Sequence, residues 1–213
     1  MRENKIVGIY LAAGQSTRMG SDKLGLPIGP MNLGNYALTA ALNSRLDYVC
    51  IIAKDIAPSW IDSSIFHQNS FKSKWSITCC PEAQLGQAYS LRCGIQAAIA
   101  MEAKAAMILL ADQPFITTEM INELLIRFQT HSVDDSISFI ASSYDGLARP
   151  PVIFDQMMFP DLLQLQNDQG ARHLIRKGQS GLCVDFPNPD LFMDVDTADD
   201  YRVLLEKLAL WKS

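Results

Sequence analysis

Short apolar runs recur along the chain, and stretches with a different spacing of apolar residues separate them. The segment 6–12 (IVGIYLA) is the first such run. An apolar run without polar alternation predicts a strand that is buried on both faces, as the strands of a parallel sheet are. Runs of the same kind predict further strands at 48–53, 76–80, 107–111, 136–142, 151–154, 182–186 and 192–195.

Between these runs, apolar residues recur at helical spacing. Leu91, Ile95 and Ile99 occupy every fourth position within 85–104, which predicts a helix there. Thr117 and Thr197 are suited to cap helices that begin directly after them. The remaining helices are predicted at 35–44, 117–129, 170–177 and 198–211.

Strands that alternate with helices predict an α/β fold, here a three-layer sandwich on a Rossmann-like, mainly parallel sheet. The later strands follow one another at shorter intervals, which predicts an antiparallel portion and therefore a mixed sheet. No linker, internal repeat or low-complexity stretch divides the chain. We therefore expect residues 1–213 to form a single domain.

The balance of charge narrows the class of partner. Lys and Arg number 18 against 23 Asp and Glu, which gives a formal net charge of −5, and no basic block is present. Such a chain is unsuited to bind nucleic acid or a membrane surface. A few well-placed cations could still hold a small anion.

The cysteines and the N-terminal segment indicate the cellular compartment in which the protein works. The five cysteines are odd in number and no pair has C-x-x-C spacing, which argues against a zinc site and against a disulfide framework. The chain starts without a signal-peptide pattern, and it has no apolar run of about 20 residues that could span a membrane. These features predict a cytoplasmic, reduced protein.

Three segments that carry chemistry follow predicted strands, where ligands bind in parallel α/β sheets. The first is 11–20 (LAAGQSTRMG), followed by Lys23. Its small residues at 12–14 allow backbone N–H groups to approach a ligand, and Arg18 and Lys23 add positive charge. The spacing matches neither a Walker A motif nor G-x-G-x-x-G. The loop therefore suits a phosphate group, and the alternative is a surface turn with two solvated cations.

The other two segments contribute carboxylates. Asp112 directly follows an apolar strand, where it could ligate a hard cation such as Mg²⁺ or, alternatively, only cap the turn before Pro114. Asp194 and Asp196 alternate on a predicted strand and therefore share a face, where their charges repel unless a cation lies between them. The alternative is that Asp196 caps the last helix and Asp194 is simply exposed.

A cationic phosphate loop together with strand-end acids is the set that phosphoryl or nucleotidyl transfer needs, because these reactions depend on positioning and charge neutralisation. The sequence offers no equally complete alternative. His67, His131 and His173 are scattered, which argues against a Ser/His/Asp site and against a histidine-rich metal site.

The same residues carry a family resemblance. The segment 11–23 (LAAGQSTRMGSDK) resembles the signature loop of the MobA-like nucleotidyltransferases, roughly L-A-[AG]-G-x-[SG]-x-R-M-G-x-x-K. Four later segments resemble the molybdenum cofactor cytidylyltransferase branch of that family, in the same order along the chain: 86–94 (GQAYSLRCG), 110–114 (LADQP), 168–172 (DQGAR) and 194–197 (DVDT). Within this branch the chain looks most like the PucB type of purine catabolism, which is associated with molybdenum hydroxylases.

The resemblance implies a Rossmann-like nucleotidyltransferase fold and a Mg²⁺-dependent reaction. In that reaction CTP is joined to the phosphate of molybdopterin or of its molybdenum form, and pyrophosphate is released. The acceptor phosphate oxygen attacks the α-phosphorus of the nucleotide. The cytidylyl enzymes tend to read LAAG in the loop where the guanylyl enzymes read LAGG, so Ala13 favours CTP.

The resemblance also implies a role for individual residues. Arg18, Lys23 and Asp112 would be catalytic, and Mg²⁺ would be held by Asp112 with Asp194 or Asp196. The acceptor would be bound by Arg92 and Arg172, although Arg92 could instead be an ordinary arginine on a helix surface. Arg149 departs from the family pattern and is expected either to take over an anion contact to the acceptor or to belong to a loop whose ligand has changed. The nucleotide would be bound by Leu11, Ala12, Ala13, Gly14, Arg18, Lys23, Ser90 and Asp112.

Two departures from the family pattern fall on the acceptor side. Ala148 and Arg149 stand before the strand that begins Pro151-Val152, where relatives often carry Gly and His, and Asn167 stands where Gly is frequent. Two alternatives to the leading hypothesis therefore remain. The acceptor could be a sugar or polyol phosphate, or the protein could carry the cofactor to a molybdenum hydroxylase apoenzyme without performing any chemistry.

Overall fold

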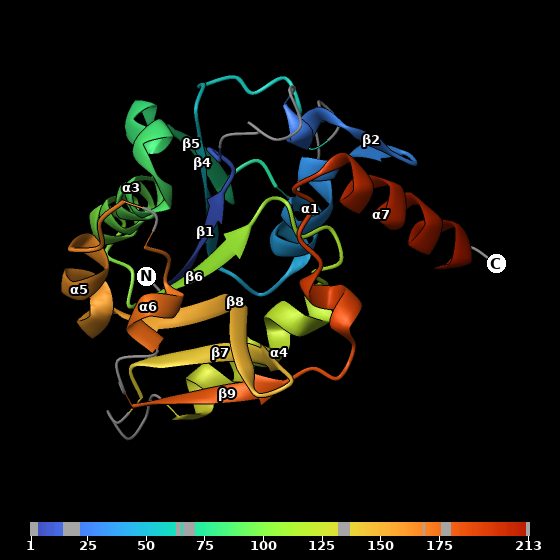
Figure 1. Cartoon of the computed structure of the whole chain (residues 1–213). Helices are drawn as coiled ribbons and strands as arrows, with labels where there is room; N and C mark the ends of the chain where they lie inside the picture. The colour runs from blue at the N-terminus through green and yellow to red at the C-terminus, as the bar shows by residue number, and fades with distance from the viewer. Residues whose placement is uncertain are drawn as a thin grey trace.

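A mixed sheet forms the centre of the protein (Figure 1). The computed structural model describes residues 4–14, 22–62, 65, 71–131, 137–167, 169–175 and 180–211. Within these residues the sheet has seven strands in the order β5-β4-β1-β6-β8-β7-β9. Strand β8 runs antiparallel to both of its neighbours, and the other neighbouring pairs are parallel. The strands are β1 (Ile6–Leu11), β4 (Tyr48–Ala53), β5 (Trp75–Cys79), β6 (Ala105–Leu110), β7 (Phe139–Tyr144), β8 (Leu147–Asp155) and β9 (Gly181–Asp185).

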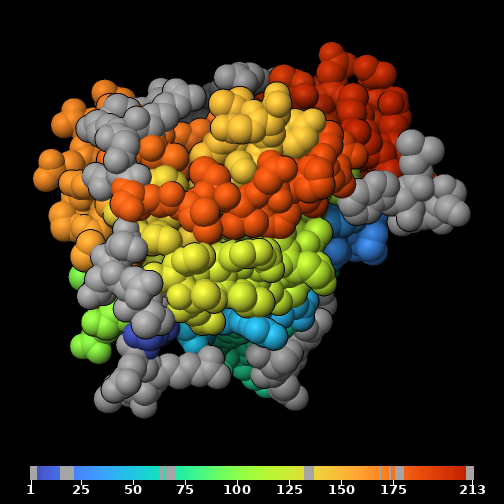
Figure 2. All heavy atoms as spheres, turned by 90° about the horizontal axis from the view of Figure 1, so that it is seen from below, coloured from blue at the N-terminus to red at the C-terminus, as the bar shows by residue number. Residues whose placement is uncertain are grey.

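Helices cover both faces of this sheet. Helices α1 (Tyr36–Asn43) and α4 (Thr118–His131) pack on one face. The opposite face carries α3 (Gln87–Ala100), α5 (Phe159–Leu163) and α6 (Arg172–Ile175). Figure 2, a view from below, shows α4 (yellow-green) on the surface with β9 (orange-red) beside it.

Shorter elements complete the chain. The C-terminal helix α7 (Ala198–Trp211) closes a separate small core with Ile28, Leu33 and Phe115. Strands β2 (Pro27–Ile28) and β3 (Met31–Asn32) form a short antiparallel hairpin. The 3₁₀ turns are η1 (Lys23–Gly25), η2 (Leu33–Asn35), η3 (Pro81–Leu85), η5 (Gln156–Met158) and η6 (Pro189–Phe192).

The apolar run of β1 explains why both faces of the sheet are covered. Tyr10 faces the side of α1 and α4, whereas Ile9 faces α3, and both side chains are fully buried. Gly94 lets α3 approach this strand closely, because a side chain at this position would collide with Ile9. This packing sets the N-terminal turns of α3 beside the end of β1, where the predicted phosphate loop begins.

The predicted fold class is confirmed, including the mixed sheet, since β8 is antiparallel. The strands β1 and β4 lie where the apolar runs predict them. Thr117 and Thr197 accept hydrogen bonds from the amides of Met120 and Asp200, as N-caps do.

The predicted strand at 192–195 is wrong. Turn η6 ends at Phe192, and the chain then runs without regular structure to α7. Pro189 begins this turn, and the side chain of Asn188 accepts a hydrogen bond from the amide of Asp190. The Val195 amide donates to the carbonyl of Asp112, at 3.0 Å, so the segment is tied to the end of β6 rather than to the edge of the sheet.

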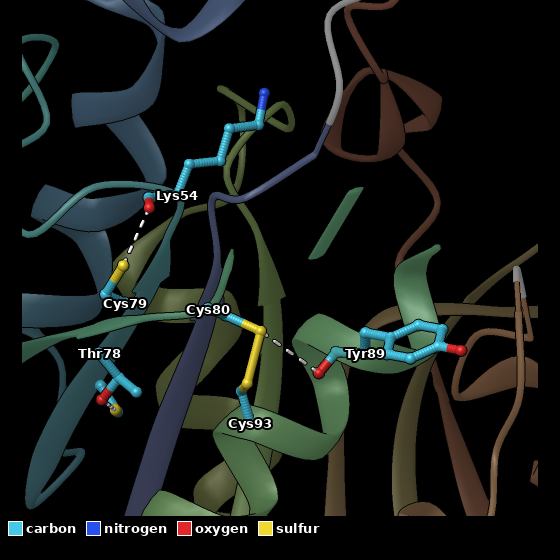
Figure 3. Close-up of a disulfide and its surroundings, with 7 residues drawn as sticks. Lys54, Thr78, Cys79, Cys80, Tyr89 and Cys93 are labelled. Carbon is cyan, nitrogen blue, oxygen red and sulfur yellow. Dashed lines mark hydrogen bonds between the residues drawn. A yellow bond between two sulfur atoms is a disulfide. The ribbon is translucent and has the colours of Figure 1, made fainter. Parts of the chain in front are cut away.

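The expectation that the cysteines form no disulfide is also wrong. Cys80 and Cys93 are joined, and Cys80 Sγ lies 3.7 Å from the carbonyl oxygen of Tyr89 (Figure 3). The two cysteines are 13 positions apart, on the turn after β5 and on α3. Cys50, Cys79 and Cys183 are free. In the part of the chain that is described, no helix combines the length and the apolar composition that crossing a membrane requires.

Candidate active site

One lysine joins two carboxylates that are far apart in the sequence. Lys23 Nζ lies 2.7 Å from Asp112 Oδ2 and 2.7 Å from Asp196 Oδ1. The three side chains come from η1, from the end of β6 and from the segment before α7. Lys23, which follows the predicted phosphate loop, is therefore brought together with two of the predicted metal ligands.

Local structure holds two of these three residues, Lys23 and Asp196. Asp22 caps η1 by accepting a hydrogen bond from the Leu24 amide, which fixes the start of the turn that carries Lys23. Asp196 precedes a capping box in which the Thr197 amide donates to Asp200 Oδ2 at 2.8 Å. The Asp196 amide donates to the same oxygen at 3.1 Å. The position of Asp196 is therefore set by the N-terminus of α7.

Electrostatics keep Lys23 charged. Only 9 % of its side chain is exposed, and burial alone would lower the pKa of the ammonium group. The neighbouring charges and hydrogen bonds of Asp112 and Asp196 outweigh burial, so the net pKa of Lys23 is raised. The lysine therefore remains an ammonium ion around neutral pH and balances the two carboxylates.

Asp194 has a different environment from Asp196. Gln113, which is fully buried, donates from Nε2 to Asp194 Oδ1 at 2.8 Å. Burial raises the pKa of Asp194, and the negative charge of Asp112 adds to this effect. Asp194 is therefore an oriented and partly buried acid behind the pair that contacts Lys23.

The donor set suits a hard divalent cation. Asp112 and Asp196 both reach the same ammonium nitrogen, so their oxygens are close enough to share one cation. Among the described residues, no group of three Asp, Glu, His or Cys side chains is arranged to hold a metal by itself. An ion here would therefore take its remaining ligands from water or from substrate phosphates, as Mg²⁺ commonly does.

These residues stand at the junction of a two-part cleft. The part that we call the η3 lobe has a volume of about 520 Å³ and is lined by Gly14, Lys23, Ser90 and residues 83–87. The part that we call the α6 lobe has a volume of about 550 Å³ and is lined by Leu91, Val152, Asp194 and residues 169–172. Both lobes are also lined by Leu11, Gln87, Leu110, Asp112 and Asp196.

Most of the predicted loop and acid residues line this cleft. Leu11, Gly14, Lys23, Ser90 and Asp112 line the η3 lobe. Ala12 and Ala13 line neither lobe, and the Ala12 amide donates to the carbonyl of Ile52 at 2.8 Å, so that it is engaged within the sheet. Arg18 and Asp168 lie outside the described residues.

The three arginines that were predicted to bind the acceptor lie at three different places in the structure. Arg172 lines the α6 lobe. The guanidinium of Arg149 lies 5.9 Å from the ring of Phe192, outside both lobes. Arg92 also lines neither lobe, and its guanidinium lies 4.4 Å from the ring centre of Tyr89 on the same helix. The structure therefore brings only Arg172 to the cleft itself.

Sequence reasoning missed Gln87, which lines both lobes. It lies against Gly170, where an added methyl group would come within 2.8 Å of Gln87 Oε1. The Ala88 amide donates to the carbonyl of Asn167, which ties the same two segments together. The signal was present, since Gln87 and Gly170 belong to two of the motif segments. Gly86 precedes Gln87 with a φ of 134°, a conformation that favours glycine.

Two lobes that meet at a cation and two carboxylates can hold two phosphate compounds and bring them into contact, which is the arrangement of a nucleotidyltransferase. The sequence model of the MobA-like NTP transferase domain matches residues 8–182, and the chain belongs to this family. The predicted family is thereby confirmed, and the protein is a nucleotidyltransferase.

The chain is 36 % identical over 208 residues to the purine catabolism protein PucB of Bacillus subtilis (strain 168), covering 96 % of this chain and 98 % of that protein. The crystal structure of Rv0371c from Mycobacterium tuberculosis H37Rv is similar at a TM-score of 0.72 and 26 % identity, over 95 % of this chain and 99 % of that one. A structure of Rv0371c in complex with manganese has a TM-score of 0.69 and 24 % identity, with the same shares covered.

Proposed function

We propose that this protein transfers CMP from CTP to the phosphate of a molybdopterin-type cofactor, with release of pyrophosphate, in the cytoplasm and with Mg²⁺. The dinucleotide product would serve the maturation of a molybdenum hydroxylase. The observation that carries the proposal is the two-part cleft, whose lobes share Asp112 and Asp196 at their junction. The η3 lobe takes the nucleotide, and the α6 lobe takes the acceptor.

The reaction needs little covalent chemistry from the protein. An oxygen of the acceptor phosphate forms a bond to the α-phosphorus of CTP, and the bond from that phosphorus to the pyrophosphate oxygen breaks. The leaving pyrophosphate keeps the electron pair. Lys23 supplies a fixed positive charge beside this centre, where negative charge spreads in the transition state.

The carboxylates prepare the same place for a metal ion. Asp112 and Asp196 would hold Mg²⁺, which when bound neutralises phosphate charge and orients the triphosphate. Asp194, which lines the α6 lobe beside them and is oriented by a hydrogen bond from Gln113, would add a third negative charge near the ion. Manganese in the related Rv0371c structure is compatible with a divalent ion in proteins of this fold.

The choice of CTP rests on the loop sequence and on the relatives. Ala13 follows the cytidylyl form of the motif, and PucB, at 36 % identity, matches nearly the whole chain. The donor can be identified by thermal unfolding with Mg-CTP and with Mg-GTP at equal concentrations. We expect the larger rise in Tm with Mg-CTP, because stabilisation grows with ligand concentration over Kd. A larger rise with Mg-GTP would reject CTP as the donor.

The activity itself is tested by pyrophosphate release from purified protein supplied with CTP, Mg²⁺ and molybdopterin. We expect release that depends on all three, and a loss of about 100-fold or more in Asp112→Asn, because one electrostatic group at the reacting centre contributes that much. Asp161→Asn is the matched control, since this exposed acid lies on α5, away from both lobes.

The alternatives give different results in this assay. Release with sugar or polyol phosphates but not with molybdopterin would assign the protein to the second acceptor class. No release with any acceptor, combined with stable binding of the finished dinucleotide and of a hydroxylase apoenzyme, would identify a carrier. Equal activity of Asp112→Asn and the native protein would contradict the role given to the junction.

A further inference from the structure

A third cavity lies next to the α6 lobe. This cavity, which we call the hairpin chamber, has a volume of about 250 Å³ and is lined by residues 146–149, Arg172, Ile175 and Cys183. Arg172 lines both the chamber and the α6 lobe. In Figure 2 the β7–β8 hairpin (gold) lies beside β9 (orange-red), and these two elements supply most of the walls.

The chamber is positively charged in a protein whose net charge is −5. Of the lining residues that the structure describes, two are arginines and none is acidic. Arg149 Nε is buried and finds no hydrogen-bond partner among the described residues. A buried donor without an acceptor is unfavourable, whereas the positive charge of the guanidinium group favours an anionic ligand in the chamber.

The position of Arg172 links the chamber to the reaction. An acceptor phosphate that reacts near Asp112 lies in the α6 lobe, and Arg172 stands between that lobe and Arg149. Under the proposed function, a short phosphate ester would need only the α6 lobe, whereas a longer acceptor would extend past Arg172 toward the hairpin chamber.

We propose that the hairpin chamber binds a second anionic group of the acceptor, separate from the phosphate that reacts. This inference rests on the proposed function, because it assigns the α6 lobe to the acceptor. It restricts the acceptor to phosphate esters that carry another negative centre at a distance. It thereby disfavours simple sugar or polyol monophosphates, which have no such group.

The charge of the chamber can be measured without any substrate. Cys183 is a free, exposed thiol in the chamber wall, and iodoacetate and iodoacetamide alkylate the same thiolate but differ in charge. Burial raises the pKa of Cys183 and slows both reagents equally, so the ratio of the two rates reports the local potential. Peptide-resolved mass spectrometry reads this ratio at Cys183, with exposed Cys79 as an internal reference.

We expect Arg149→Gln to lower the iodoacetate-to-iodoacetamide ratio at Cys183 by about threefold, which is the effect of one charge at about 6 Å in a watery environment. The ratio at Cys79 should not change. The matched control is Arg127→Gln, an exposed arginine on α4 that pairs with Glu123. An unchanged ratio in Arg149→Gln would overturn the proposal.

The link to the acceptor is tested by steady-state kinetics. Arg149→Gln should raise the KM for molybdopterin about tenfold, with the KM for CTP and the Tm close to those of Arg127→Gln. A lowered alkylation ratio with an unchanged acceptor KM would overturn the assignment to the acceptor. If no acceptor supports turnover but the ratio still falls, the proposed function fails while the chamber remains an anion site.

Discussion

Lys23 contacts two carboxylates at once and holds them together. Its ammonium group contacts both Asp112 and Asp196, and these acids are also the candidate metal ligands. An ammonium ion and a divalent cation therefore compete for the same oxygens. At the scale of one residue, the charge by which Lys23 stabilises the folded protein is the same charge that it would offer to a triphosphate in the proposed reaction.

This double role predicts the behaviour of Lys23→Gln. In metal-free buffer the variant should lose about 1–3 kcal/mol of stability, since one partner of a mostly buried ion pair is removed and the acids are left to repel. Added Mg²⁺ or Mn²⁺ should raise the Tm of the variant more than that of the native protein, because the metal replaces the missing charge.

The control for this measurement is Lys207→Gln, which breaks a partly buried pair that Lys207 forms with Asp190 at 2.7 Å, away from both lobes. Its Tm should respond to metal as the native Tm does. The measurement is the Tm of each protein by thermal unfolding, with and without Mg²⁺ or Mn²⁺. An identical metal response in Lys23→Gln and Lys207→Gln would contradict competition between the lysine and the metal.

The residue types of the site were predictable, but their pairing was not. Lys23 and Asp112 follow strand ends, and this position alone indicates that their side chains meet at the ligand-binding edge. Nothing in the sequence shows that Gln113 donates a hydrogen bond to Asp194, or that Lys23 contacts Asp196 and not Asp194. That division depends on the path of the chain before α7, where a strand was predicted and an irregular segment is found.

At the scale of elements, the Cys80–Cys93 bond (Figure 3) joins the two ends of the segment that supplies one wall of the η3 lobe. The turn η3 and the first turns of α3 lie between the two cysteines. The enclosed residues that line the lobe are Ala83, Gln84, Leu85, Gly86, Gln87 and Ser90. The bond therefore limits how far this wall can move from α3, and with it the shape of the lobe to which we assign the nucleotide.

We predict that Cys93→Ala weakens both stability and nucleotide binding. Loss of a link across a loop of this size lowers the free energy of unfolding by about 3 kcal/mol. The KM for the nucleotide should rise about threefold to tenfold, because the wall must then be ordered on binding. Chemical denaturation and initial rates measure the two effects.

Cys79→Ala is the matched control, because Cys79 is a free thiol next to Cys80 that hydrogen-bonds to the carbonyl of Lys54 (Figure 3). Its properties should stay close to native. Treatment of the native protein with a thiol reductant should reproduce Cys93→Ala. If the reductant changes neither stability nor KM, the link has no part in shaping the lobe.

The elements whose positions agree with the prediction are those that are determined by residues close together in the sequence. Strands β1 and β4 are continuous apolar runs, and α7 starts at the Thr197 cap. The hairpin of β2 and β3 has two residues in each strand, which is too short for any periodicity. The disulfide depends on where α3 lies against β5, and only the tertiary fold brings Cys93 to Cys80.

At the scale of the whole molecule, the cleft lies where the sheet changes direction. Strands β5, β4, β1 and β6 are parallel, and their carboxyl ends carry the η3 lobe. Antiparallel β8 pairs Val152 with Ile108, so its first half extends past the end of β6 and lines the α6 lobe. Asp112 follows β6 at this boundary, which is why one carboxylate serves both lobes.

Because each lobe has lining residues that the other lacks, we predict that the binding of each substrate can be weakened without changing the binding of the other. Leu85 lines the η3 lobe and is 56 % exposed, so Leu85→Glu adds a negative charge there without opening the core. It should raise the Kd for the nucleotide about tenfold through repulsion of the triphosphate, and leave the acceptor KM unchanged. Leu205→Glu, on exposed α7, is the matched control.

Arg172→Gln should show the opposite pattern, with an acceptor KM raised about tenfold and a nucleotide Kd within about twofold of native. In the double variant the two free-energy changes should add within about 0.5 kcal/mol, because the substitutions act on different lobes. Nucleotide titration without acceptor separates the effects, and thermal unfolding verifies that each variant is folded. If Arg172→Gln weakens nucleotide binding as strongly as Leu85→Glu does, both lobes hold the nucleotide and the acceptor must bind elsewhere.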